Sequence, residues 1–308
     1  MGVAKSLHRT KSFMEQINLD TLNTADRKTF MAAIGEVMEL APWVAEETFA
    51  KRPFTSIAGL YQAMMDAVRH APAERRQALI DGHPDLAGKA AREGKLTADS
   101  TAEQSAAGLD KLTDQEFADF HRLNDAYRKK FAMPFIVCVR RHGKQSILRE
   151  FERRLKNDAA AEQKIALDEI FCIAALRLDQ RVKADDRLKV HGHLSTHVLD
   201  VHAGHPAQGV AIELCEIAGS GGPRVIKRAV TNADGRTDAP LFTGMPVPIA
   251  TYELRFSVAD YFTEAGAPMA APPFLDIVPV RFSIAEPEGR YHVPLLVTPW
   301  SYSTYRGS

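Results

Sequence analysis

The chain has 308 residues, 45% of them hydrophobic and 25% charged, and its 39 basic side chains balance its 39 acidic ones. A formal net charge of zero without a basic block gives no electrostatic footprint for nucleic acid or an anionic membrane surface, so we expect neither partner. No apolar run approaches the roughly 18 residues of a membrane helix, and no signal-peptide core is evident near the N-terminus. The length exceeds that of one hydrophobic core, which predicts two domains.

Residues 13–181 carry the apolar spacing of amphipathic helices, which predicts an all-α helical bundle. Asn23 or Thr24 is expected to cap the first helix, and Thr113 with Glu116 forms the sequence signature of a capping box. We expect the main helices over residues 24–40, 56–71, 113–132 and from about 158 onwards.

The pattern changes beyond a charged stretch at residues 182–190, which we interpret as a linker. Residues 191–308 hold short runs rich in β-branched and aromatic residues, and Tyr252, Leu254 and Phe256 alternate with polar residues as in a half-buried strand. The segment Asn-Ala-Asp-Gly-Arg at 232–236 is a turn signal. This region is predicted to be an all-β antiparallel sandwich, with strands at 193–201, 210–217, 224–230, 251–258, 274–284 and 291–297.

Five histidines fall between residues 191 and 205, which raises the question of a metal site. On a strand, His193 and His197 share a face but stand about 13 Å apart at ~3.3 Å per residue. Zinc holds its nitrogen ligands at about 2.0–2.1 Å, so these two histidines cannot easily share an ion. His191 and His193 could form a weaker chelating pair, but no Asp, Cys or Glu is a clear candidate for a further ligand. We therefore expect no metal, and we expect His191, His193 and His205 to be solvated loop or strand-end residues.

His197 stands out because of its possible partners. A lone histidine in mid-strand is more often a satisfied core residue, but Arg236 closes the predicted turn and His292 lies in the last strand. An imidazole can activate water near neutral pH, and an arginine can stabilise the charge that develops on an attacked carbonyl oxygen. Two histidines and an arginine therefore suit hydrolysis of an amide-like ring bond.

Three segments, "LSTHVLDVHAGHPAQGV", "TNADGR" and the terminal "YHVPLLVTPWSYSTYRGS", resemble the 5-hydroxyisourate hydrolases, which have the transthyretin fold. Arg290 departs from the family, which commonly has a histidine there. Members commonly form tetramers with sites at subunit interfaces. The resemblance implies His197, Arg236 and His292 as catalytic residues, with Tyr305, Arg306 and Ser308 as substrate contacts.

The helical region has its own candidate residues. "GHPD" at 82–85 reads either as a turn with a solvent-facing His83 or as part of a site. Ser100, Glu103 and Gln104 fall in the first turns of a short expected helix. Arg177 is flanked by apolar residues, where a guanidinium must find a partner or reach water.

Four segments, "HPDLAG", "STAEQSAAGL", "PFIVCV" and "EIFCIAALRL", resemble the decarboxylase of 2-oxo-4-hydroxy-4-carboxy-5-ureidoimidazoline, abbreviated OHCU. This family commonly forms dimers. The resemblance implies His83 and Glu103 as catalytic residues, and as substrate contacts Pro84, Ser100, Gln104, Arg177 and the backbone near Phe135 and Ile136.

The two families catalyse consecutive steps, so each resemblance supports the other. Together they predict an enzyme of urate breakdown that hydrolyses 5-hydroxyisourate to OHCU and decarboxylates OHCU to (S)-allantoin, with no cofactor and as a homo-oligomer. A module that has lost catalysis and only binds a ligand is the alternative.

The cysteine pattern and one short motif bear on the compartment. Cys138, Cys172 and Cys215 are odd in number and widely spaced, as is typical of reduced thiols, and predict a cytoplasmic protein. Related plant fusions carry a peroxisomal signal of Arg-Leu, five residues and His-Leu near the junction. In "RLKVHGHL" four residues separate the two pairs, so a peroxisomal location is the less favoured alternative.

Overall fold

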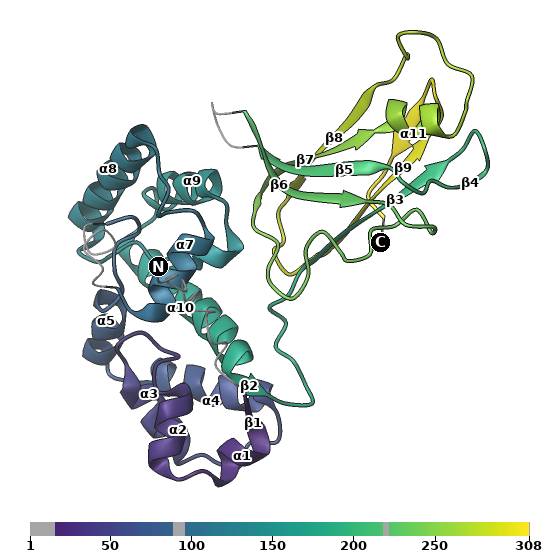
Figure 1. Ribbon diagram of the computed structural model, residues 1–308. Coiled ribbons are helices and arrows are strands. Elements are labelled where there is room, and N and C mark those ends of the chain that lie inside the picture. Colours follow the sequence, from purple (N-terminus) through teal and green to yellow (C-terminus); the bar gives the residue numbers. More distant parts are fainter. Residues whose placement is uncertain (1–15, 89–95, 218–221, 308) are drawn as a thin grey trace, which may run out of the picture. The chain divides into compact units, whose positions relative to one another are not determined.

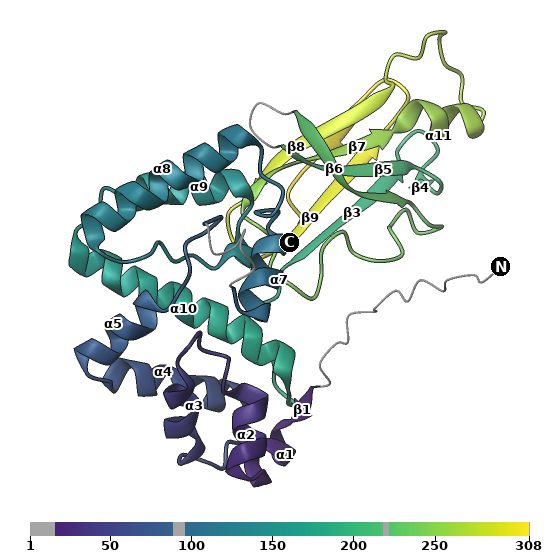
Figure 2. The ribbon, with the colours of Figure 1, turned by 60° about the vertical axis from the view of Figure 1, so that its left-hand side comes forward.

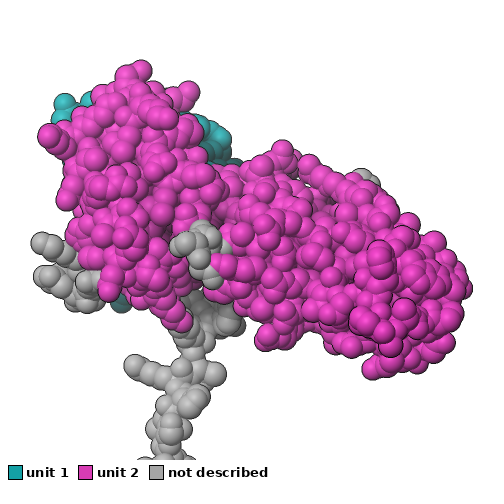
Figure 3. All heavy atoms as spheres, turned by 90° about the horizontal axis from the view of Figure 1, so that it is seen from above, with its two compact units in different colours: residues 1–82, 171–188 teal, residues 83–170, 189–308 magenta. Residues whose placement is uncertain are grey.

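The computed structural model describes residues 16–88, 96–217 and 222–307. The chain forms two compact units, which Figure 3 distinguishes by colour. One contains the residues up to 82 together with 171–188, and the other contains 83–170 together with 189–308. The predicted contact Ser308 and the first residues of the predicted helical domain, 13–15, lie outside the described ranges. The predicted boundaries at 181 and 191 remain predictions.

The first unit consists of helices and one short parallel strand pair (Figure 1). Ser56 caps α4 by accepting a hydrogen bond from Gly59 N at 3.0 Å, as its sequence indicated. The helices are α1 (Leu19–Thr24), α2 (Arg27–Ile34), α3 (Pro42–Phe49), α4 (Ile57–His70) and α5 (Ala73–Asp81), and the strands are β1 (Ile17–Asn18) and β2 (Val182–Lys183).

The first predicted helix is wrong at both ends. Asp26, not Asn23 or Thr24, caps α2 and accepts from Thr29 N at 2.7 Å. The Asn23 side chain is occupied elsewhere, because it exchanges two 2.8 Å hydrogen bonds with the backbone of Phe54. The helix ends at Ile34, and the apolar residues expected to extend it are buried in the turns that follow.

Residues after β2 fasten the end of this unit. The Asp186 carboxylate accepts from Ile57 N at 2.8 Å and Ala58 N at 3.1 Å, at the start of α4. Arg187 binds Asp179 on α10 (Ala159–Arg181) through two hydrogen bonds of 2.9 and 2.6 Å. The predicted linker thus contributes contacts to the helical packing.

The second unit begins with the helices α7 (Ala98–Ala106), α8 (Asp114–Phe131) and α9 (Lys144–Arg154), the 3₁₀ turn η1 (Val139–Arg141) and the first part of α10. Thr113 and Glu116 form the predicted capping box at the start of α8. Figures 1 and 2 both show α8 and α9 side by side. A buried aromatic cluster lies between them, in which the Phe135 and Phe151 rings stack 3.6 Å apart.

The rest of this unit is a sandwich of two four-stranded sheets, ordered β10-β9-β3-β4 and β6-β5-β7-β8. The pairing is antiparallel except for β3 with β9, which run parallel, so the fully antiparallel prediction was wrong at this pair. The short helix α11 (Val258–Glu264) was also not predicted. The strands are β3 (His193–Asp200), β4 (His205–Pro206), β5 (Ala211–Ile217), β6 (Pro223–Val230), β7 (Ala250–Ser257), β8 (Ile277–Ile284), β9 (Arg290–Val297) and β10 (Tyr302–Thr304).

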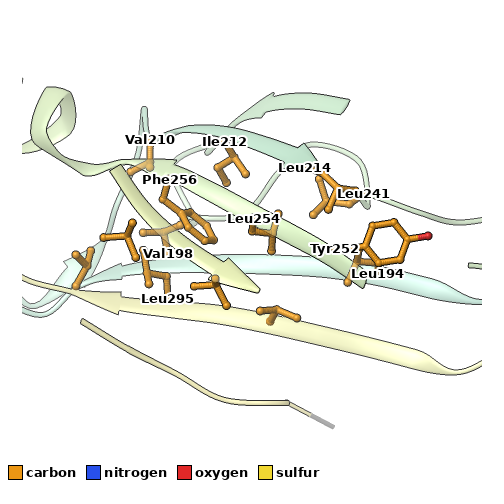
Figure 4. Packing of buried hydrophobic residues seen from close by; sticks show 14 of the residues in the cluster. Leu194, Val198, Val210, Ile212, Leu214, Leu241, Tyr252, Leu254, Phe256 and Leu295 are labelled. Carbon is orange, nitrogen blue, oxygen red and sulfur yellow. The ribbon is translucent and has the colours of Figure 1, made fainter. Parts of the chain in front are cut away.

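Apolar side chains from both sheets fill the space between them, as Figure 4 shows for Val198, Leu254, Phe256 and Leu295. Along β3, alternate residues point into this core, and the intervening His193, Ser195 and His197 are only half-buried. The sandwich and its strand period therefore place His197 on the outer face of its sheet.

Candidate functional site

The parallel register of β3 and β9 sets the two predicted catalytic histidines near each other. Ser195 pairs with His292, and His197 pairs with Pro294 two residues further along. The imidazole centroids of His197 and His292 are 6.5 Å apart, and Ser195 Oγ lies 3.0 Å from His292 Nδ1. Both rings therefore lie on one face of the sheet, and Ser195 is a partner of His292 that sequence reasoning did not assign.

The turn after β6 brings Arg236 beside His197. His197 and Arg236 form an antiparallel bridge, and Val198 N donates to Gly235 O at 2.8 Å. Gly235 has φ +70°, and a Cβ there would lie 2.3 Å from Val198 O, so this close approach requires glycine.

Asn232 shapes the same turn and is a site residue that sequence reasoning missed. Its side-chain Oδ1 accepts from Asp234 N at 3.0 Å and Arg236 N at 3.2 Å, and its backbone N–H donates to Arg236 O at 2.7 Å. An asparagine opening a turn of this kind was the available signal.

The C-terminal segment runs antiparallel along the free edge of β9. Tyr302 pairs with Val297, and the same register reaches Gly307, whose N–H donates to His292 O at 2.8 Å. Pro294 interrupts the ladder between them because it lacks an N–H. A Cβ at Gly307 would lie 2.7 Å from His292 Cδ2, so the backbone passes directly against this imidazole.

The predicted substrate contacts near the terminus that the structure describes, Tyr305 and Arg306, are exposed, unlike Gly307, which lies against His292. Arg306 is exposed and lies over the Tyr291 ring at 4.8 Å, and Tyr305 is 58% exposed. Ser308, expected to line the site, is not among the described residues. The described part of the tip thus brings Gly307 to His292 and leaves Tyr305 at the surface.

Burial and positive charge both favour the neutral form of the two imidazoles. Burial, followed by the Arg236 guanidinium, holds the pKa of His197 below its usual value of 6.5. The pKa of His292 is lowered by burial and then by Arg236, His197 and His193. Within the described residues, Nε2 of His197 is shielded from solvent and makes no hydrogen bond. A neutral imidazole with an available nitrogen can accept a proton from water.

The candidate residues of the helical region lie at helix ends and in the loops between helices. His83 follows the end of α5 and is 7% exposed, so the alternative of a solvent-facing turn histidine was wrong. Pro84 is half-buried, and the next residue, Asp85, accepts two hydrogen bonds of 2.9 and 3.0 Å from Arg128 Nε on α8.

The short helix α7 and the loop containing His83 are connected by hydrogen bonds. Ser100 and Gln104 are buried on α7, and Glu103 is half-buried. Gln104 Oε1 accepts from Ala87 N at 3.1 Å. Asn124 on α8, which sequence reasoning did not single out, donates from Nδ2 to Leu86 O at 2.8 Å. These two amide side chains thus bind the backbone of consecutive loop residues, Leu86 and Ala87.

A cavity of about 270 Å³ lies beside α7. Gln104 lines this cavity, whereas His83, Ser100 and Glu103 are not in its wall. Its lining residues are Ala87, Leu96, Thr101, Gln104, Ser105, Leu109, Asp110, Leu112 and Phe117.

Phe135 and Ile136 are buried in the non-helical segment between α8 and η1. Arg177 belongs to the other compact unit, where its Nη1 lies 2.7 Å from Glu39 Oε2 and both residues are buried. The expectation that Arg177 needs a partner is confirmed, and its partner comes from 138 residues earlier in the chain.

The part of the chain that the structure describes contains neither a cluster of side chains suited to a metal ion nor a helix suited to span a membrane. Across residues 16–88, 96–217 and 222–307, no group of three or more His, Cys, Asp or Glu side chains is arranged to hold a metal ion. Over the same ranges no helix is long and apolar enough to cross a membrane.

Comparison with known proteins identifies a family for each half. Residues 23–179 match the family model described as OHCU decarboxylase, and residues 194–307 match that of the HIUase/Transthyretin family. Over 167 residues the chain is 39% identical to a 2-oxo-4-hydroxy-4-carboxy-5-ureidoimidazoline decarboxylase of Halalkalicoccus jeotgali, covering 54% of this chain and 93% of that protein.

The second half also has a relative that is matched over nearly its whole length. Over 118 residues the chain is 55% identical to a 5-hydroxyisourate hydrolase of Deinococcus radiodurans, covering 38% of this chain and 98% of that protein. A solved structure of (S)-allantoin synthase is 32% identical, with 95% of this chain and 100% of that chain covered and a TM-score of 0.48. The chain therefore belongs to the OHCU decarboxylase family in its N-terminal half and to the HIUase/transthyretin family in its C-terminal half.

Proposed function

We propose that this chain is a bifunctional enzyme that hydrolyses 5-hydroxyisourate to OHCU and then decarboxylates OHCU to (S)-allantoin. One observation carries this proposal. The two halves of the chain match, over nearly their whole lengths, two enzymes named for consecutive reactions. Nothing in the comparisons supports the alternative of a module that only binds a ligand.

The sandwich supplies the groups for ring opening. His197 and His292 are half-buried imidazoles that Arg236 helps to keep neutral, so one of them can take a proton from the attacking water. Arg236 is assigned to stabilise the negative charge on the attacked carbonyl oxygen. The water oxygen bonds to the carbonyl carbon, the ring C–N bond breaks, and the departing nitrogen receives a proton.

The helical half supplies the groups for decarboxylation. When the bond to the carboxylate breaks, its electron pair stays on a ring carbon, and the adjacent carbonyl and imine can delocalise that charge. We assign His83 to proton transfer and Glu103 to its orientation. Protonation from one face would make the product optically active. Pro84, Ser100, Gln104, Arg177 and the backbone at Phe135 and Ile136 are assigned as substrate contacts, on the family resemblance.

We further propose a homo-oligomer in which sandwiches form a tetramer and helical halves form dimers. Resemblance to the transthyretin-like family supports the tetramer of sandwiches, and resemblance to the decarboxylase family supports the dimers of helical halves. Light scattering coupled to size exclusion should give a mass that is a multiple of the chain's 34.0 kDa, and a monomeric mass at working concentration would contradict the proposal. A cytoplasmic location is proposed from the cysteine pattern and can be checked by cell fractionation.

The function is tested with freshly generated 5-hydroxyisourate and the purified 308-residue chain. Absorbance should show accelerated loss of the substrate, and circular dichroism should show the build-up of optically active allantoin. Loss of 5-hydroxyisourate without a dichroism signal would support the hydrolase alone. Neither signal above the enzyme-free rate would overturn the proposal.

A further inference from the structure

A buried stretch without regular structure forms part of the proposed OHCU site. Residues 134–138 connect α8 to η1, and all of them are buried. Peptide groups shielded from water need hydrogen-bond partners, and this stretch has neither helix nor sheet to provide them. Side chains do so instead, because Ile136 O accepts from Arg154 Nη1 at 2.6 Å and Cys138 N donates to Glu169 Oε2 at 2.8 Å.

Arg154, the last residue of α9, is 1% exposed, and each of its three guanidinium nitrogens donates a hydrogen bond. Besides the Ile136 carbonyl, it binds Glu162 Oε2 at 2.9 Å and the Tyr127 hydroxyl at 3.2 Å. Its guanidinium carbon lies 4.5 Å from the centre of the Phe135 ring. One cation thus holds both predicted contact residues, Ile136 through its carbonyl and Phe135 through its ring.

Both carboxylate oxygens of Glu162, the acidic partner of Arg154, also accept hydrogen bonds. Glu162, near the start of α10, is 0% exposed. Its Oε2 accepts the Tyr127 hydroxyl and Arg154 Nε, and its Oε1 accepts from Asn157 Nδ2 at 2.7 Å. The Tyr127–Arg154–Glu162 cluster therefore joins three helices to one irregular segment.

Stability alone gives a weak reason for this cluster. Desolvation offsets much of the attraction within a buried ion pair, and well-packed apolar residues often serve the fold equally well. The directional part of the arrangement is the planar Arg154 fork, which fixes the Ile136 carbonyl and Glu162 at once. An apolar replacement would fill the space without fixing that carbonyl.

We propose that Tyr127, Arg154 and Glu162 are positioning residues of the decarboxylase, which hold the Phe135–Ile136 backbone in the orientation that binds OHCU. This inference rests on the proposed function, in which that backbone contacts the substrate. The three residues act through Ile136 and Phe135, since their polar groups are used within the cluster.

The sharpest test is Tyr127→Phe, which removes one hydroxyl and retains the ring that packs against Phe131, Phe135 and Phe151. We expect kcat/KM for OHCU to fall about 10-fold, chiefly through KM, because the segment binds the substrate and a shift of a fraction of an ångström suffices. Arg154→Lys retains the charge but loses the fork, and should reduce kcat/KM by about 100-fold.

Phe120→Leu is the matched control, because Phe120 is fully buried on α8 and packs against Phe151 without bonding residues 134–138. It should lower the melting temperature and leave KM for OHCU unchanged. Hydrolysis of 5-hydroxyisourate by the same chain reports the amount of active protein in each variant.

If Tyr127→Phe keeps the parental KM and kcat for OHCU, or changes them only as much as Phe120→Leu does, the cluster is structural and the inference is overturned. A parent enzyme that does not decarboxylate OHCU would instead overturn the proposed function. The parent's activity thus separates the two failures.

Discussion

The two candidate sites of this chain are built in opposite ways. In the sandwich, His197 and His292 come from neighbouring strands, and register alone sets their separation. In the helical half, His83 lies in a loop after one helix and Glu103 lies on another short helix. A strand positions its side chains by its period, whereas a loop must be fixed by hydrogen bonds from elsewhere in the chain.

The residues that hold the candidate catalytic and substrate-binding residues in place also differ between the two halves. The sandwich site depends on close backbone approaches, at Gly235 beside His197 and at Gly307 beside His292. In the helical half, long-range side-chain bonds such as Asn124 to Leu86 and Arg154 to Ile136 hold the segments that contain candidate residues. Added bulk should therefore damage the first site, and lost hydrogen bonds should damage the second.

The largest expected effect follows from replacing His83. His83→Ala should lower the decarboxylation rate by roughly 10²- to 10⁴-fold, the usual scale for a general acid or base. Ring opening should continue at the parental rate, because the hydrolase site uses other residues. Circular dichroism of allantoin and absorbance of 5-hydroxyisourate measure the two steps. An unchanged rate of optically active product would show that His83 has no such role.

Added bulk at the sandwich site gives the next effect. Gly307→Ala places a Cβ 2.7 Å from His292 Cδ2, so the ring must turn away. We expect hydrolase kcat/KM to fall by about 10-fold, with decarboxylation unchanged. Ser303→Ala, on the exposed strand β10 of the same terminal segment, is the control and should behave like the parent. Equal activity of both variants would mean that the terminus does not position His292.

The pH dependence tests the charge environment of the same histidines. Their folded-state pKa values are lowered, so the neutral forms persist as pH falls past 6.5 and are lost only below that value. Hydrolase kcat/KM should therefore stay level down to about pH 6.5 and then fall about tenfold per pH unit below the lowered pKa.

The lowered pKa values of His197 and His292 also make the free energy of unfolding fall as the pH is lowered. Their contribution to stability is complete above the unfolded-state pKa near 6.5 and is lost as pH falls through the folded-state pKa.

NMR titration of Arg236→Gln should give higher pKa values for both imidazole rings, because a nearby positive charge has been removed. Unshifted values would exclude Arg236 as a cause.

The smallest effect comes from a local feature of the helical half. Thr113→Ala removes half of the capping box of α8 and should cost about 1 kcal/mol of unfolding free energy. Both activities at 25 °C should be unchanged, because neither site uses this helix end. Denaturant unfolding and the two kinetic assays check this. A selective loss of decarboxylation would show that α8 transmits small changes to the site.

Which candidate residues lie near one another was easier to predict from the sequence in the sandwich than in the helical half, for a physical reason. The face shared by Ser195 and His197 follows from a period of two, which is visible in a single strand. The parallel pairing of β3 with β9 was not visible, since no local pattern encodes which strands meet. Family resemblance, more than residue spacing, pointed to the residues of the helical site.

The features of the helical half that the sequence did not predict are contacts between residues far apart in the chain. No motif in the sequence singled out Arg154 and Glu162, and both side chains are buried, at 1% and 0% exposed. The first predicted helix was misplaced because Asn23 bonds to Phe54, a contact across 31 residues. Local propensity carries no information about such partners.

The central claim is that one chain holds two separate active sites for consecutive reactions. A complementation assay with His83→Ala and His197→Ala tests it most directly, starting from 5-hydroxyisourate. Each variant alone should form optically active allantoin far more slowly than the parent. In His83→Ala, uncatalysed protonation favours neither face, and in His197→Ala, slow uncatalysed ring opening limits the supply of OHCU. An equimolar mixture should restore rapid formation, since one variant supplies OHCU and the other consumes it. If the mixture is no faster than the two variants separately, or if either variant alone matches the parent, the claim is contradicted.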